Sequence, residues 1–161
     1  MEVVYARCCG RNIHKQVLVA CLVTPGPDGE RRKEVRRFGA MTADIAALGD
    51  WLAEAGCTHV AMESTGVYWK PIDNLLEGRF TLVLVNPQHR QAVPGRKTDV
   101  RDCEWLADLL QHGLVRGSFV PDQPQRELRE LTRYRTALVR QRTAEVNRLQ
   151  KTPEGANVNT E

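Results

Sequence analysis

The sequence of residues 97–102 is Lys-Thr-Asp-Val-Arg-Asp, and it stands at the start of an apolar helical pattern. Asp99 and Asp102 are spaced so that a helix presents both carboxylates on one face, with Cβ atoms about 5–6 Å apart. Thr98 is a candidate N-cap for this helix, and acidic residues are favourable in a first helical turn. A second interpretation stays open, because two carboxylates on one rigid face also suit Mg²⁺, which prefers oxygen ligands.

An apolar stripe follows the two aspartates and predicts that the helix, which runs to about His112, packs on a core. Its members are Trp105, Leu106, Leu109 and Leu110.

The preceding residues alternate between strand-like and helix-like patterns. Strands are expected over 3–12, 16–24, 33–38, 59–63 and 81–85, and helices over 43–55, capped by Thr42, and over 67–76. The strand over 33–38 is rich in charge, which is typical of a sheet edge. Three strands followed by alternating helices and strands predict an α/β protein whose mixed sheet has helices on both faces.

The composition narrows the class of protein. The chain has 161 residues, of which 42% are hydrophobic, and this is enough for one domain plus an appendage. No apolar run reaches the roughly 18 residues of a membrane span, and the N-terminus has no signal-peptide pattern. The five cysteines lack the spacing of a zinc site and lie mostly in apolar runs. We therefore expect reduced core cysteines in a cytoplasmic protein that does not bind membranes.

Positive charge is concentrated near the C-terminus. The segment 126–151 holds eight Lys or Arg and three Glu, within a long helix expected over 125–150. This charge indicates either a polyanionic partner or a solvated helix face. Leucines along the same helix would permit self-association, whereas Arg135 and Arg142 interrupt the apolar seam.

The strand pattern also predicts where polar groups meet. Glu63 ends the apolar strand over 59–63, where a glutamate is out of place for core packing. If this strand and the first strand are neighbours, Glu63 comes close to position 12, and the helix that carries Asp99 and Asp102 closes over both.

Several stretches, taken together and in this order, resemble one known family. They are Cys8-Cys9-Gly10, His14-Lys15, the residues from Met62 to Trp69, Asn86-Pro87, Gly95 to Asp99, Asp102, Trp105 to Leu110, and Leu131 to Arg135. The chain resembles the N-terminal domain of DEDD-type transposases of bacterial insertion sequences, which are recombinases guided by a bridge RNA. The resemblance implies a ribonuclease H/RuvC-like fold, with a mixed sheet flanked by helices and followed by a long C-terminal helix.

The family pattern implies four acidic residues that are both catalytic and ligands of Mg²⁺ or Mn²⁺. Glu63, Asp99 and Asp102 match three of them, and Asn12 takes the place of the first, an aspartate. Asparagine keeps an oxygen ligand but loses a negative charge, which weakens binding of a hard divalent cation. The side chain of the neighbouring Arg11 is expected on the opposite face of the strand.

The implied partners are DNA and a structured guide RNA, with metal-dependent phosphoryl transfer on DNA as the activity. Sequence-independent contacts to phosphates are expected from a basic loop and from the long helix. The residues concerned are Arg90, Arg96, Lys97, Arg133, Arg135, Arg140 and Arg142.

The expected organisation is a RuvC-like catalytic-type domain over 1–120, a long basic helix over 121–151, and a frayed tail over 152–161. The family carries a further domain with a nucleophilic serine, and no serine here matches it, which predicts a truncated copy that is inactive alone. Two alternatives stay open: a structure-selective nuclease of the Holliday-junction-resolvase type, and a non-catalytic fragment that binds nucleic acid or forms dimers through the long helix.

Overall fold

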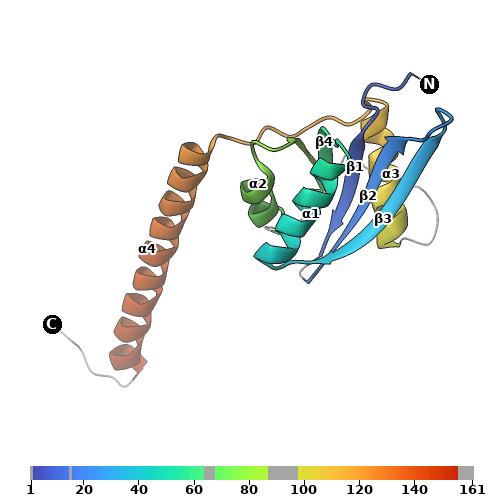
Figure 1. Cartoon of the computed structure of the whole chain (residues 1–161). Coiled ribbons are helices and arrows are strands. Elements are labelled where there is room, and N and C mark those ends of the chain that lie inside the picture. The colour runs from blue at the N-terminus through green and yellow to red at the C-terminus, as the bar shows by residue number, and fades with distance from the viewer. Residues whose placement is uncertain (1, 15, 64–67, 87–97, 156–161) are drawn as a thin grey trace. The chain divides into compact units, whose positions relative to one another are not determined.

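The computed structural model describes residues 2–14, 16–63, 68–86 and 98–155, which form a sheet with flanking helices and a long C-terminal helix (Figure 1). The elements are β1 (Cys8–Ile13), β2 (Val17–Pro25), β3 (Arg31–Gly39), α1 (Thr42–Glu54), β4 (His59–Glu63), α2 (Lys70–Leu76), β5 (Thr81–Val85), α3 (Asp99–Gln111) and α4 (Gln123–Gly155).

The five strands form one mixed sheet in the order β3-β2-β1-β4-β5. β1 pairs antiparallel with β2, and β2 pairs antiparallel with β3. On its other side β1 is parallel to β4, which is parallel to β5. Thus β1 and β4 are neighbours, and the charged strand β3 lies at an edge of the sheet, as predicted.

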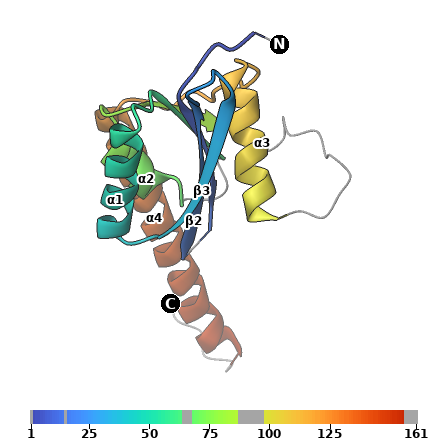
Figure 2. The ribbon, with the colours of Figure 1, turned by 45° about the vertical axis from the view of Figure 1, so that its right-hand side comes forward.

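Helices cover both faces of the sheet. α1 and α2 lie on one face and α3 on the other (Figure 2). The predicted fold class, a mixed sheet flanked by helices with a long helix at the C-terminal end, is confirmed.

α3 packs closely on the centre of the sheet because β1 carries a glycine there. A Cβ built on Gly10 would lie 2.2 Å from the Ala107 nitrogen and 2.4 Å from the Cys103 carbonyl oxygen. The core between α3 and the sheet includes Leu106 and Leu110 from the helix. All five cysteines are buried and unpaired, in agreement with their prediction as core residues.

The start of α3 is capped as expected, since the Thr98 hydroxyl accepts a hydrogen bond from the Arg101 nitrogen at 3.3 Å. The predicted cap of α1 is wrong. Thr42 is the first residue of that helix, Met41 is its N-cap, and no side chain makes a cap hydrogen bond.

The first strand begins later than predicted, at Cys8 rather than at residue 3. The nitrogens of Val4 and Tyr5 donate to the Gln111 carbonyl oxygen at the end of α3, at 2.9 and 3.1 Å. The two residues therefore satisfy that helix end instead of extending the sheet ladder.

The chain separates into two compact units, Met1–Phe119 and Val120–Glu161. The second unit consists mainly of α4, which runs past the predicted end of the helix and includes Pro153. Across the described residues, no helix combines the length and the apolar character that a membrane crossing requires.

Candidate functional site

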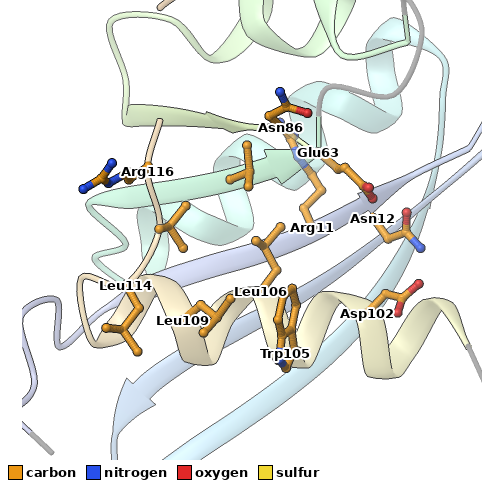
Figure 3. A pocket seen from close by; sticks show the side chains of 12 residues that line it. Arg11, Asn12, Glu63, Asn86, Asp102, Trp105, Leu106, Leu109, Leu114 and Arg116 are labelled. Atoms are coloured by element: carbon orange, nitrogen blue, oxygen red, sulfur yellow. The ribbon is translucent and has the colours of Figure 1, made fainter. Parts of the chain in front are cut away.

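Polar side chains meet where β1 and β4 end. Asn12 follows Arg11, which pairs with Met62, so Asn12 lies beside Glu63 at the carboxyl end of β4. Asp102 in the first turn of α3 faces the same region, and the three side chains gather at one end of a pocket (Figure 3). The carboxyl ends of parallel strands share one sheet edge, which is why residues so distant in sequence come together here.

Asp99 lies beside this group and is engaged by two hydrogen-bonding partners. Its Oδ1 atom lies 2.8 Å from the His14 Nε2 atom. The Asn12 Nδ2 atom donates to the same oxygen at 3.4 Å. Asn12 thus acts as a donor to a carboxylate, which an ionised aspartate at this position cannot do.

The arrangement of these side chains bears on whether the site can hold a divalent metal ion. Carboxylate and amide oxygens are the ligands that Mg²⁺ prefers. Among the described residues, however, no three His, Cys, Asp or Glu side chains are placed to hold one ion. Asp99 is bonded to His14 and Asn12 rather than sharing the pocket with Glu63 and Asp102. These side chains, as arranged, do not fit a four-ligand metal site.

The remainder of the pocket is mostly apolar. Trp105 and Leu109 line it, although the sequence pattern placed both in the core beneath α3. Leu106 and Leu110 are buried in the core. Trp105 and Leu109 each precede one of these residues by one position, about 100° around the helix, and therefore face the pocket instead of the centre of the core. Further lining residues are Val85, Asn86, Leu106, Leu114, Val115 and Arg116.

Arg116 lies at the pocket because the segment that follows α3 runs beside β5, a position that the sequence pattern does not predict. After α3, the chain runs back along β5, with a bridge between Val85 and Gly117. The Ser118 nitrogen donates to the Leu84 carbonyl oxygen at 2.6 Å. This segment has no strand pattern, so no sequence signal places Arg116 at the site.

Most of the chain matches a known protein family. The family model for DEDD transposases of the IS110 type, described as a transposase, matches residues 9–156. The chain belongs to this transposase family. No curated protein gives a significant match to the sequence.

Solved structures that resemble this transposase domain include two Holliday junction proteins. One is a Fowlpox virus resolvase in complex with substrate Holliday junction DNA, at 9% identity and a TM-score of 0.49, covering 66% of this chain and 99% of that chain. The other is RuvC of Thermus thermophilus, at 10% identity and a TM-score of 0.48, covering 70% of this chain and 99% of that chain.

The position of Arg11 in the transposase domain follows the expected strand alternation. Its guanidinium is fully buried and Nη2 donates to the Met62 sulfur at 3.1 Å. Burial lowers the pKa of Arg11 to about 10, an effect that the buried Asp73 carboxylate on α2 opposes. The positive charge next to Asn12 therefore lies toward the α2 side of the sheet, although Arg11 also borders the pocket.

The predicted phosphate-binding residues fall into two groups. Arg90, Arg96 and Lys97 lie outside the described residues. The others are exposed side chains of α4, in the second unit. They are Arg133, Arg135, Arg140 and Arg142.

Proposed function

We propose that this chain is a DNA-binding, RuvC-like domain that serves recombination of DNA, with little or no strand cleavage by itself. The observation that carries the proposal is the meeting of Asn12, Glu63 and Asp102 at the ends of β1 and β4, with Asn12 donating to Asp99. Residues 1–120 form the catalytic-type domain in this proposal, and residues 121–151 form a basic helix attached to it.

The site has three carboxylates, one negative charge fewer than the four-acid pattern of the family. Carboxylates repel a phosphate backbone, and an aspartate at position 12 would add to the repulsion from Asp99 and Glu63. Asn12 removes one negative charge and donates a hydrogen bond to Asp99. His14 contacts the same carboxylate. The polar end of the pocket therefore repels a phosphate less strongly than the four acidic residues of the family pattern would.

The same features disfavour cleavage. A divalent cation would polarise a phosphoryl oxygen and orient an attacking hydroxyl. Here the donor set has lost one charge, and Asp99 is held by Asn12 and His14. Metal-dependent phosphoryl transfer with Mg²⁺ or Mn²⁺, which the family pattern implies, is thus expected to be impaired in this copy.

Affinity for the phosphate backbone is supported by α4. Between Arg126 and Lys151 the helix has eight basic residues against three glutamates. The four arginines expected to contact phosphates are all exposed. Such contacts are independent of base sequence and weaken steeply with added salt.

A binding and cleavage assay tests the proposal. The purified chain, Glu63→Gln and Asn12→Asp are incubated with a labelled four-way DNA junction and a matched linear duplex, in Mg²⁺ or Mn²⁺. We expect salt-dependent DNA binding by all three proteins, and no cleavage by the natural chain. Absence of binding would overturn the proposed function. Junction cleavage that is lost in Glu63→Gln would overturn the inactivity and favour a structure-selective nuclease.

We also propose that the chain binds a structured guide RNA and that it associates with a second copy through α4. The exposed apolar side chains of α4, such as Leu131 and Leu149, support self-association. Arg135 and Arg142 among them argue for weak packing. Light scattering over a concentration series checks the oligomeric state, and a filter-binding assay with structured RNA checks the RNA partner.

A further inference from the structure

A row of residues crosses the sheet at the height of the candidate site. Asn12 on β1 pairs with Val19 on β2, and Val19 pairs with Arg37 on β3. Val19 is buried in the core beneath α3, and Val35 packs against the same core. Because side chains alternate along a strand, Arg37 lies on the α3 face of the sheet, the face of Asn12.

Most of the positive charge of β3 is already paired. Arg31 and Lys33 form ion pairs with Asp108 near the far end of α3, the latter at 2.9 Å. Arg36 pairs with Glu34 at 2.7 Å and lies over the Trp51 ring.

Two arginines of β3 differ from these. Arg32 and Arg37 are exposed, and neither forms an ion pair with any described residue. They lie on opposite faces of the strand, because they are an odd number of residues apart. Arg37 alone is on the α3 face at the end where Asn12 lies.

The position of Arg37 suits a phosphate. A DNA strand at the pocket would meet the carboxylates of Glu63 and Asp102, which offer it no attraction. Adjacent strands lie about 4.8 Å apart, so the backbone of Arg37 is roughly 10 Å from that of Asn12. Each strand of a duplex carries one phosphate per roughly 3.4 Å of helix axis, so a duplex at the pocket has further phosphates at a comparable distance, within reach of the Arg37 side chain.

We propose that Arg37 at the edge of the sheet binds a backbone phosphate of the DNA that lies at the pocket. The inference rests on the proposed function, since it extends that DNA site from the pocket to the edge strand β3. Arginine suits this role because its planar guanidinium binds phosphate through two parallel hydrogen bonds.

The test compares Arg37→Gln with Arg32→Gln, a matched control on the same strand and the opposite face. Fluorescence anisotropy measures binding of a fluorescein-labelled DNA duplex and of a four-way junction over a salt series. For Arg37→Gln we expect affinity about fivefold to tenfold lower, and a log–log salt slope smaller by about 1. Arg32→Gln should stay within about twofold of the natural chain. Urea unfolding of both variants verifies that the fold is intact.

The outcomes separate this inference from the proposed function. If the natural chain binds DNA and Arg37→Gln binds it equally well, the inference is wrong and the DNA-binding function stands. Equal losses in both variants would also overturn it, because neither the face nor the end of the strand would matter. If the natural chain binds neither DNA, both proposals fail. An RNA duplex of the same sequence is measured alongside, and a loss by Arg37→Gln that is confined to this RNA would overturn the assignment to DNA.

Discussion

The helices α3 and α4 contrast sharply. α3 has 13 residues, and a buried stripe that includes Cys103, Leu106 and Leu110 fixes its rotation on the sheet. α4 has 33 residues, and its large apolar side chains are 42% to 71% exposed. Packing therefore determines which residues α3 presents to the site. The sequence of α4 favours a helix through its residue propensities, and its side chains form an extended basic surface that no buried stripe orients.

The largest expected effect comes from the contact between β1 and α3. In Gly10→Val, the new Cβ would lie 2.2 Å from the Ala107 nitrogen, so α3 cannot stay in place. We expect a loss of about 3 kcal/mol or more in the free energy of unfolding, measured in urea. The control is Gly155→Ala in α4, where a Cβ meets nothing within 4 Å. A similar loss in both variants would contradict the contrast between the helices.

Truncation of one leucine in α3 and one in α4 tests whether packing holds the first helix more firmly than the second. Leu110 on α3 is 1% exposed and Leu131 on α4 is 66% exposed. Leu110→Ala should lose about 2–5 kcal/mol of stability because it leaves a cavity. Leu131→Ala should change stability by less than about 0.5 kcal/mol. Urea denaturation measures both, and comparable values would show that α4 is also held by packing.

The buried thiols give the first unit a pH dependence at alkaline pH. Burial raises the pKa of Cys8 to about 11 and that of Cys57 to about 12, from a usual value of 9. The folded chain thus holds these protons more tightly than the unfolded chain. Stability should be unaffected by these thiols below about pH 9 and should fall as the pH rises toward 11–12.

Urea midpoints at several pH values measure this fall, and Cys57→Ala should reduce its slope. Thiol labelling provides a second readout within the same comparison. All five native cysteines should resist alkylation, whereas the thiol of Leu131→Cys in α4 should react rapidly. Rapid labelling of the natural chain would contradict the burial of its cysteines.

The smallest effects concern surface ion pairs. Lys33 pairs with Asp108 of α3 where both side chains are about one-third exposed, and Arg148 pairs with Glu145 within α4 where both are more exposed. Lys33→Met should cost less than about 1 kcal/mol, and Arg148→Gln should have no measurable effect. Thermal unfolding would detect the opposite ranking, which would contradict the structural difference between the two pairs.

Much of the first unit follows from sequence patterns. The spacing of apolar residues defines α3, and Thr98 caps it as expected. With the first strand beside the strand over 59–63, the pattern predicts that Asn12, Glu63, Asp99 and Asp102 meet. The structure brings Asn12, Glu63 and Asp102 together in one pocket, and Asp99 lies beside it, bonded to Asn12 and His14. Their roles in chemistry stay a prediction. The family follows from the motifs, and the match over residues 9–156 confirms it.

Other features depend on contacts that no local pattern reveals. Trp105 and Leu109 belong to the apolar pattern of α3, and only the rotation of the packed helix shows that they line the pocket. The bond between Asn12 and Asp99 requires the helix start to be placed against the end of β1. The position of Arg37 level with Asn12 follows only from the register of β1, β2 and β3. The sequence of β3 alone indicates a charged edge strand and does not distinguish Arg37 from its neighbours.

The side chain at position 12 determines whether the site binds a divalent cation, and a titration with metal ions tests this role of Asn12. Isothermal titration calorimetry with Mn²⁺ and Mg²⁺ compares the natural chain with Asn12→Asp. The added carboxylate cannot donate to Asp99 and supplies the missing charge, so only the variant should bind the ions measurably. Equal binding by both proteins, or binding by neither, would contradict the claim.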